Sequence, residues 1–357
     1  MFRLKRFDFY LFLPALFLLG IGVAIIASVS PSRLFNYLIY IIISFIFFLF
    51  FALFDFDILF PFSPIIYIGC VLFLILPFFL GITSRGSTRW IPVGEFTIQP
   101  SELVKPFLAL ISAWFWSKGE FTLRKLIFFA LAFCPVFILI FLQPDLGSAL
   151  VTLSMFSGMV VVSGLDFKKI LIFFLLGLSI LPFFWFSLKD YQRLRIIHFI
   201  NPYSDPLGEG YNLIQSKIAV GSGGIFGRGL GRGTQSHLFF LPERHTDFIF
   251  ASLSEELGFL GSSLVLFLYL LFFLRILKIA AKVKEKRLYF LSMSILFYLS
   301  FQAIVNLGMN IGILPITGVT LPFVSYGGSS LLSNMISLGL LQAVYQRAEE
   351  EKIIEIR

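Results

Sequence analysis

Long apolar stretches alternate with short charged segments along the whole chain. Because a charge at the centre of a membrane helix costs ~2.5 to 3.5 kcal/mol or more, uncharged gaps mark the expected membrane spans. Seven gaps of 18 to 27 residues are long enough to span a membrane. They lie between Asp8 and Arg33, Arg33 and Asp55, Asp57 and Arg85, Lys125 and Asp145, Asp145 and Asp166, Lys169 and Lys189, and Glu256 and Arg275.

Two further regions of the chain supply three more spans. Residues 288–346 carry no charge and are too many for one crossing, and Gly, Pro and Ser interrupt them, so two spans are expected. Residues 102–117 are apolar enough for a tenth span, although Glu102 and Lys105 stand at its start. The predicted fold class is an all-α polytopic membrane protein of about ten transmembrane helices, forming a single domain over residues 1–357.

The basic residues support ten spans and orient them. Ten spans put both termini on one side, and 17 of the 28 Lys and Arg residues then lie on that side. Four lie in short opposite segments and seven in one long opposite loop. Cytoplasmic segments carry such an excess, so both termini are predicted to be cytoplasmic. This distribution explains the net charge of +8 without a nucleic-acid partner.

Composition excludes the other broad classes of protein. The chain is 58% hydrophobic and 13% charged, whereas soluble domains are ~25% charged. Cys70 and Cys134 both lie in apolar stretches, so no disulfide framework is expected. The first apolar stretch is too long for a signal peptide and lacks a small-residue cleavage site.

The sizeable polar region is residues 188–247, between the seventh and eighth predicted spans, and it is expected to be an extracytoplasmic loop. It holds all three histidines and twelve charged residues. Its glycine-dense part, Gly221–Gln235, has two interpretations: a flexible linker, or a loop whose backbone approaches an anionic group beside Arg228 and Arg232. No Walker A pattern is present, so a nucleotide site is weakly supported.

Asp247 stands where this polar region enters an apolar helix. It is either a capping or first-turn carboxylate or a general base at the membrane surface. Glu243 and His245 precede it and could complete a cluster, but no HExxH motif supports zinc. Glu255 and Glu256 follow within the apolar stretch, where an interfacial pair or a partnership with a nearby cation is the favoured interpretation.

Other polar residues stand at the predicted span ends. Arg89 is an interfacial anchor or a site residue, and Asp145 is a turn former or a cavity carboxylate. Lys105, just inside a span, indicates a functional site by default, although Glu102 could merely neutralise it. Residues 308–330 carry prolines, glycines and hydroxyls, which predict a re-entrant outer segment lining a polar cavity.

Four segments are recognisable together: RWIPVGEFTIQPSELVK, QPDLGSA, FLPERHTDFIFASLSEELG and LPFVSYGGSS. In this order, on ten predicted spans, they resemble the SEDS family (shape, elongation, division and sporulation proteins) over essentially the whole chain. The run GTQSHLFFLPERHTDFIF and the short termini are more similar to the rod-shape members than to the division members.

The resemblance implies a peptidoglycan glycosyltransferase of the bacterial inner membrane. Such an enzyme joins lipid II disaccharides through β-1,4 links during cell elongation, releases undecaprenyl pyrophosphate, and works with a class B penicillin-binding protein and elongation-complex membrane proteins. Asp247 matches the essential aspartate of the family. The expected substrate-binding residues are Arg89, Glu102, Lys105, Asp145, Lys217, Glu243, His245 and Ser325.

The implied chemistry assigns roles to these residues. Asp247 would be the general base for the acceptor hydroxyl, a role that contributes ~100-fold or more. Attack on the donor sugar would invert its anomeric centre, and cations such as Arg89 and Lys105 would offset the charge of the leaving pyrophosphate. Mg²⁺ or Mn²⁺ could assist, with its ligands left open, and no organic cofactor is expected. The chain has no Ser-x-x-Lys sequence, so a partner must supply transpeptidation.

Three rival functions stay open at this point. Ten spans with intramembrane charges also suit a lipid II flippase. A polymerase of the division type is the second rival, and a non-catalytic scaffold for the penicillin-binding protein is the third. The long outer loop that ends at Asp247 favours extracytoplasmic chemistry without excluding transport.

Overall fold

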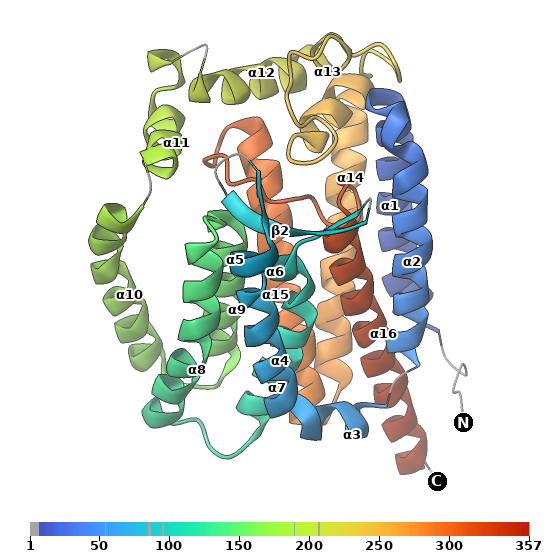
Figure 1. Ribbon diagram of the computed structural model, residues 1–357. Coiled ribbons are helices and arrows are strands. Elements are labelled where there is room, and N and C mark those ends of the chain that lie inside the picture. The colour runs from blue at the N-terminus through green and yellow to red at the C-terminus, as the bar shows by residue number, and fades with distance from the viewer. Residues whose placement is uncertain are drawn as a thin grey trace.

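The structure is a computed structural model that describes residues 7–53, 55–84, 87–94, 96–188, 190–205 and 208–356. Helices dominate it (Figure 1). Each of the ten predicted spans contains a main helix, although Arg85 and Lys189, which bound two of them, lie outside the described residues. These helices are α1 (Phe9–Val29), α2 (Leu34–Ala52), α4 (Ser63–Ile75), α7 (Lys105–Ser117), α8 (Leu123–Leu142), α9 (Leu146–Val162), α10 (Phe167–Ser187), α14 (Ile249–Lys282), α15 (Lys286–Ile311) and α16 (Gly328–Ile356).

Length and hydropathy identify this chain as a polytopic α-helical membrane protein. Among the described residues, six helical stretches are long and apolar enough to cross a membrane, and α9 is a shorter apolar helix. The six are Phe9–Val29, Pro31–Ala52, Phe56–Leu80, Leu123–Leu142, Ile249–Lys282 and Lys286–Ile311. Their surfaces expose many large apolar side chains, which suit contact with lipid rather than water.

Local sequence explains where several helices begin and end. The Asp8 carboxylate accepts hydrogen bonds from the backbone N–H groups of Tyr10 and Leu11, and so caps α1. Asp145 caps α9 in the same way through the N–H of Ser148. Gly312, at φ 79°, ends α15 in the left-handed conformation that glycine adopts without steric cost.

A small antiparallel sheet interrupts the helices, so the all-α prediction missed one element. It comprises β1 (Ile82–Ser84), β2 (Ser87–Val93) and β3 (Phe96–Ile98) in the order β1-β2-β3. The preceding stretch folds as α3 (Phe56–Leu59), η2 (Phe60–Phe62), α4 and α5 (Pro77–Leu80). The last apolar residues of this predicted span form strand β1. The prediction missed the strand because charge spacing measures only apolar length and cannot distinguish a strand from the end of a helix.

The long polar region is largely folded. It contains α11 (Asp190–Ile200), η3 (Pro202–Ser204), α12 (Glu209–Ser222) and α13 (Thr234–His237). Figure 1 shows α12 and α13 at the end of the helix bundle opposite the start of α1 and the end of α16.

The glycine-dense segment packs closely on a break in α14 instead of forming a linker. Gly258 interrupts α14 at φ 66°, and a Cβ atom at Gly227 would overlap the carbonyl oxygen of Glu256. Backbone hydrogen bonds of 3.0 Å join Arg228 N to Glu255 O and Gly229 N to Glu256 O. The glycines therefore permit close backbone approach, but to another part of the chain.

Glu255 and Glu256 hold this segment and are both fully buried. The Glu255 carboxylate accepts hydrogen bonds from the backbone N–H groups of Gln235 (2.8 Å) and Ser236 (3.1 Å). Glu256 Oε1 accepts one from Ser28 Oγ of α1 at 2.6 Å, and His237 Nε2 lies 2.9 Å from it. Buried carboxylates require such partners.

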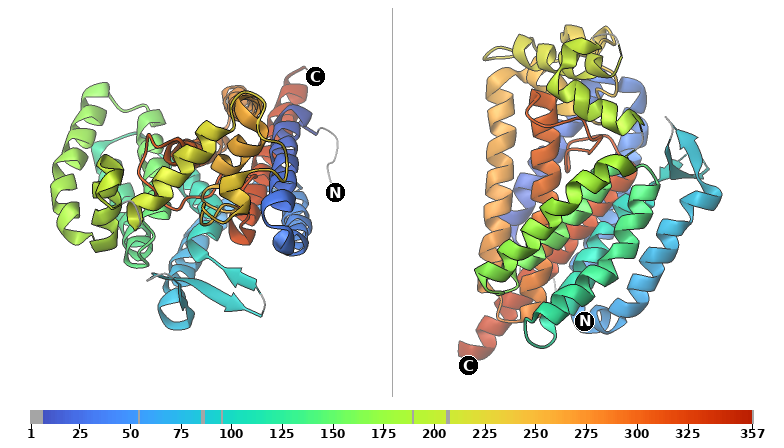
Figure 2. Two further views of the ribbon diagram at one scale, coloured as in Figure 1. Left: turned by 90° about the horizontal axis from the view of Figure 1, so that it is seen from above. Right: turned by 90° about the vertical axis from the view of Figure 1, so that its left-hand side faces the viewer.

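Helix α15 lies inside the bundle and packs on α7, α9 and α14, while α16 packs on α2 (Figure 2). Residues 312–327 connect α15 to α16 without regular structure. Val319, Leu321, Phe323 and Val324 in this segment are almost completely buried. An irregular segment thus lies within the helices where the sequence predicted a re-entrant wall.

Candidate functional site

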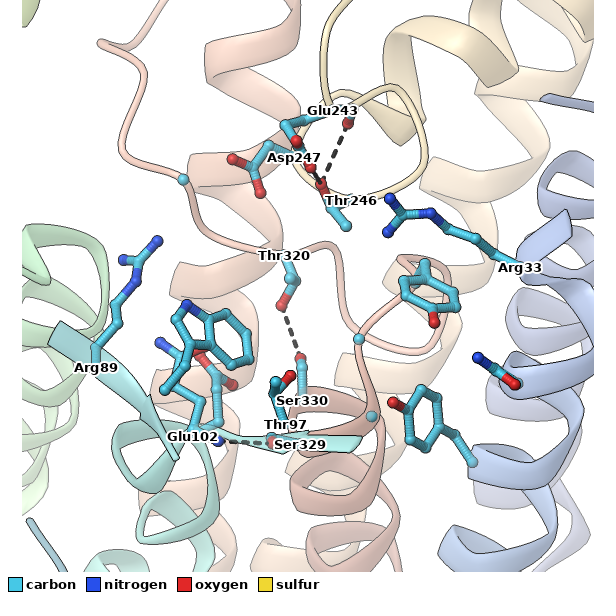
Figure 3. Close-up of a pocket in the computed structure, with 18 of the residues that line it drawn as sticks. Arg33, Arg89, Thr97, Glu102, Glu243, Thr246, Asp247, Thr320, Ser329 and Ser330 are labelled. Atoms are coloured by element: carbon cyan, nitrogen blue, oxygen red, sulfur yellow. Dashed lines mark hydrogen bonds between the residues drawn. The ribbon is translucent and has the colours of Figure 1, made fainter. Parts of the chain in front are cut away.

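A cavity of about 400 Å³ lies between α2, the sheet, α6 (Pro100–Leu103), residues 243–247 and the segment before α16 (Figure 3). Most of the side chains that line it are polar. They are Arg33, Asn36, Tyr40, Ile82, Arg89, Trp90, Thr97, Gln99, Glu102, Glu243, Thr246, Asp247, Gly318, Thr320, Tyr326, Gly327, Gly328, Ser329 and Ser330.

Asp247 reaches this cavity just before α14. Its carbonyl oxygen accepts hydrogen bonds from the side-chain amides of Asn306 and Asn310 on α15, each at 3.0 Å. The N-cap position of α14 belongs to Phe248, so Asp247 lies one residue outside the helix. Its half-buried carboxylate faces Gly318, where an added Cβ atom would lie 3.4 Å from Oδ2. Two buried amides therefore fix the backbone of a residue whose side chain lines the cavity.

The segment around Asp247 is tied to the segment before α16. Thr246 Oγ1 donates to Glu243 Oε2 at 3.0 Å, and Ser325 Oγ donates to the carbonyl oxygen of Thr246 at 2.8 Å. The His245 carbonyl oxygen accepts a hydrogen bond from Tyr326 N, and the two rings pack edge to face. Glu243 lines the cavity, whereas His245 and Ser325 act behind its wall.

Arg89 lines the cavity from β2 and pairs with Asp145, with 3.2 Å between Nη1 and Oδ1. Asp145 also accepts hydrogen bonds from Gln99 Nε2 at 2.8 Å and Ser101 Oγ at 2.9 Å. Burial alone would raise the pKa of the Asp145 carboxyl. Arg89 and the hydrogen bonds from Ser148 and Ser101 outweigh burial, so this pKa lies below its usual value. Asp145 therefore caps α9 and also holds Arg89.

Glu102 and Lys105 form a buried ion pair, with 2.6 Å between Lys105 Nζ and Glu102 Oε1. Glu102 lines the cavity, whereas the side chain of Lys105 is 1% exposed and lies behind it. Lys105 Nζ also lies 3.4 Å from Gln302 Oε1, and Gln302 Nε2 donates to the Thr320 hydroxyl at 3.0 Å. These hydrogen bonds connect Lys105 to the cavity wall through Gln302 of α15 and Thr320 of the segment before α16.

Arg33 also lines the cavity, although its place in the sequence predicts only a boundary between two spans. It ends η1 (Pro31–Arg33) before α2, and its guanidinium lies 5.5 Å from the centroid of the Tyr326 ring. The pKa of Arg244 lies below its usual value, because burial and then the charge of Arg33 lower it by more than Glu243 raises it. Figure 3 shows Arg33 and Arg89 on opposite walls of the cavity. The signal that could have identified Arg33 in the sequence is its position as the single charge between two predicted spans.

Lys217, a candidate from the sequence, lies elsewhere. It is exposed on α12 and contacts Gly312, where an added Cβ atom would overlap the lysine side chain. Arg228 Nη1 donates to Thr234 Oγ1 at 2.9 Å, and Arg232 is exposed. These three cations are absent from the described lining of the cavity.

The carboxylates of the cavity limit what metal it could hold. Within the part of the chain that the structure describes, no group of three or more His, Cys, Asp or Glu residues is arranged to hold a metal ion. Glu243 and Asp247 line one end of the cavity together (Figure 3). Mg²⁺ characteristically uses one or two carboxylates together with phosphate oxygens, and this pair is compatible with that pattern.

Comparisons with known proteins agree with this architecture. A family profile described as "Cell cycle protein" and covering FtsW, RodA and SpoVE matches residues 4–350. The chain is 42% identical over 289 residues to peptidoglycan glycosyltransferase MrdB of Escherichia coli K12, covering 79% of this chain and 77% of that protein. It is 38% identical to stage V sporulation protein E of Bacillus subtilis, covering 78% and 77%.

Solved structures show the same fold. Thermus thermophilus rod shape determining protein RodA matches with a TM-score of 0.74 and 27% identity, over 96% of this chain and 98% of that one. A chain from a peptidoglycan synthase complex that coordinates polymerization and crosslinking matches with a TM-score of 0.83 and 33% identity, over 96% and 99%. Family profile, relatives and fold together establish that the chain belongs to the SEDS family, which contains FtsW, RodA and SpoVE.

Proposed function

We propose that this protein is a peptidoglycan glycosyltransferase of the elongation type, with lipid II as substrate and Asp247 as general base. The observation that carries the proposal is that the carboxylate of Asp247 lines a polar cavity. The buried side-chain amides of Asn306 and Asn310 hold the backbone of Asp247 in place. Arg33 and Arg89 flank the same cavity. Membership of a family that includes a peptidoglycan glycosyltransferase with 42% identity supports the reaction class.

The proposed membrane arrangement has ten spans, α1, α2, α4 with α5, α7 to α10, and α14 to α16. Both termini are cytoplasmic, and residues 188–247 and the cavity are on the outer side of the bacterial inner membrane. The excess of basic residues at the terminal side supports this orientation. Residues 312–327 form a re-entrant wall, because irregular backbone at membrane depth must be buried in protein or line a polar space.

In the proposed reaction, Asp247 removes the proton from the acceptor hydroxyl, and the oxygen of that hydroxyl attacks the anomeric carbon of the donor sugar. A carbon–oxygen bond forms on one face as the bond to pyrophosphate breaks on the other, and the leaving group takes the electron pair. The α link of the donor thus becomes a β link. A half-buried carboxylate loses some of the hydration that would weaken it as a base.

The cations of the site have different proposed roles. Arg33 and Arg89 line the cavity and offset the growing charge of the pyrophosphate. Lys105 is a positioning residue, because it lies behind Glu102 and contacts it directly. Asp145 positions Arg89. Glu243 would hold Mg²⁺ or Mn²⁺, which would supply further charge neutralisation at the phosphates, while Asp247 keeps the role of proton acceptor.

We also propose that a class B penicillin-binding protein and other membrane proteins of the elongation complex are partners. The chain has no Ser-x-x-Lys sequence of its own. One structural relative belongs to a complex that coordinates polymerization and crosslinking. A transpeptidase partner would supply the missing crosslinking step.

Incubation of the purified chain and its partner with labelled lipid II tests the function. The wild-type protein should produce glycan ladders, and Asp247→Asn should lower polymerisation at least ~100-fold while folding normally, because the amide cannot accept the proton. Asp166→Asn, an exposed cytoplasmic-side carboxylate in a surface ion pair, is the matched control and should stay active. Undiminished ladders from Asp247→Asn would refute the assignment of the base, and lipid movement without polymer would favour a flippase.

A further inference from the structure

A second cavity, of about 450 Å³, lies between α1 and α14, away from the proposed active site. Residues of α1 and of α14 form its two walls, and these helices pack against one another. The lining residues are Tyr10, Leu13, Pro14, Phe17, Leu268, Leu271, Leu274, Arg275 and Lys278. None of them belongs to the polar cavity around Asp247.

The α14 wall of this groove is a single stripe with an apolar end and a basic end. Leu268, Leu271 and Leu274 follow one another at the spacing of one helix face, and Arg275 and Lys278 continue the stripe. At 1.5 Å per residue, the stripe from Leu268 to Lys278 is about 15 Å long. One leaflet of the hydrocarbon core has about the same depth, since the whole core is ~30 Å thick.

Arg275 is held in place at the basic end. Its Nε donates to Asp8 Oδ2 at 2.7 Å, and its guanidinium lies 5.4 Å from the ring centroids of both Tyr10 and Tyr345. Asp8 itself is buried and caps α1. The guanidinium has five N–H donors in a rigid fork, so the bond to Asp8 orients it and leaves other donors for a second anion.

The charge at this end favours a negative ligand. Arg275 and Lys278 line the groove, whereas Asp8 is the carboxylate paired with Arg275, so the groove end is net positive. Lys278 is exposed on α14. Beyond the groove, Lys282 is paired with Glu349, and Arg287 with Glu285 and Asp57, so the positive charge of the groove end is that of Arg275 and Lys278 themselves.

We propose that this groove is a binding site for an anionic phospholipid of the cytoplasmic leaflet. One acyl chain lies along the leucine stripe, and the phosphate of the headgroup binds Arg275 and Lys278. Basic pockets between membrane helices on the cytoplasmic side bind such headgroups. The proposal rests on the proposed orientation of the chain, and does not depend on Asp247 or on polymerisation.

The test uses the full-length protein, delipidated in detergent and titrated with phosphatidylglycerol or phosphatidylcholine of identical acyl chains, with bound lipid counted by native mass spectrometry. Phosphatidylglycerol should bind at least ~10-fold more tightly than phosphatidylcholine, since a hydrogen-bonded charged contact contributes ~1.5 to 3 kcal/mol. Lys278→Gln should remove most of this preference, and Leu271→Trp, which fills the groove, should weaken the binding of both lipids. Lys168→Gln, an exposed lysine at another basic segment, is the matched control and should behave as wild type.

Three results would overturn the proposal. The first is equal affinity for the two lipids, and the second is an equal effect of Lys278→Gln and Lys168→Gln. The third is that neither lipid binds and Leu271→Trp abolishes copurification of a partner protein, which would identify the groove as a helix-docking site. Because none of these measurements uses lipid II, their failure is distinct from failure of the proposed glycosyltransferase function.

Discussion

At the scale of single residues, the pairing of charges distinguishes the cations of the cavity. Arg89, which lines the cavity, is paired with Asp145, and Lys105, which lies behind the cavity, is paired with Glu102. Arg33 has no carboxylate partner among the ion pairs that the described residues form, and it packs over an aromatic ring. An arginine in this state keeps its charge and its fork of donors for phosphate oxygens.

Arg33→Gln is therefore expected to lower polymerisation of lipid II by about 10-fold or more, since a hydrogen bond to a charged group contributes ~1.5 to 3 kcal/mol. Arg33→Lys should restore part of the rate, because lysine keeps the charge without the fork. The exposed Arg33 makes little contribution to the core, so the thermal midpoint should stay within a degree or two. Arg124→Gln, on α8, serves as the control. Equal rates for Arg33→Gln and wild type would exclude a role for Arg33 in anion binding.

At the scale of elements, the glycine-dense segment can pack closely on α14 because glycines have no side chains at the contact. Gly227 has φ 80°, and a Cβ atom there would overlap the α14 backbone. Gly221, at the end of α12, has no atom within 4 Å of an added Cβ and no left-handed backbone. The two glycines thus differ in conformational demand although they belong to one segment.

Gly227→Ala should destabilise this contact by about 1 to 3 kcal/mol, whereas Gly221→Ala should be neutral or slightly stabilising. Limited proteolysis between Gly224 and Gly233, together with thermal unfolding, measures the difference. Faster cleavage is expected only for Gly227→Ala. If both variants resist protease equally, the segment does not depend on its close approach to α14.

At the scale of the whole molecule, the orientation of the chain in the membrane determines which leaflet each of the two cavities faces. Single cysteines introduced after replacement of Cys70 and Cys134 by Ala can report it. Arg232→Cys should react with an impermeant maleimide in intact cells, and Lys168→Cys only after permeabilisation, because the excess of basic residues places Lys168 inside. Reversed labelling would place Asp247 on the cytoplasmic side and refute extracytoplasmic synthesis.

Several features of this protein followed from the order of its residues alone. The helices could be predicted because a membrane-spanning helix needs a minimum apolar length, and charges such as Asp8, Asp145 and Arg275 interrupt that length. The polar region that ends at Asp247 followed in the same way. The motifs identified the family, and the relatives confirm it.

Other features were decided only by the tertiary structure. The sheet that carries Arg89, the burial of Glu255 and Glu256, and the approach of Arg33 to Tyr326 all depend on contacts between residues far apart in the chain. Lys217 stands in a predicted polar region like Asp247, yet only Asp247 reaches the cavity. Hydropathy along a chain measures the cost of leaving water, whereas a site depends on which charges meet, and that is determined by how the helices pack.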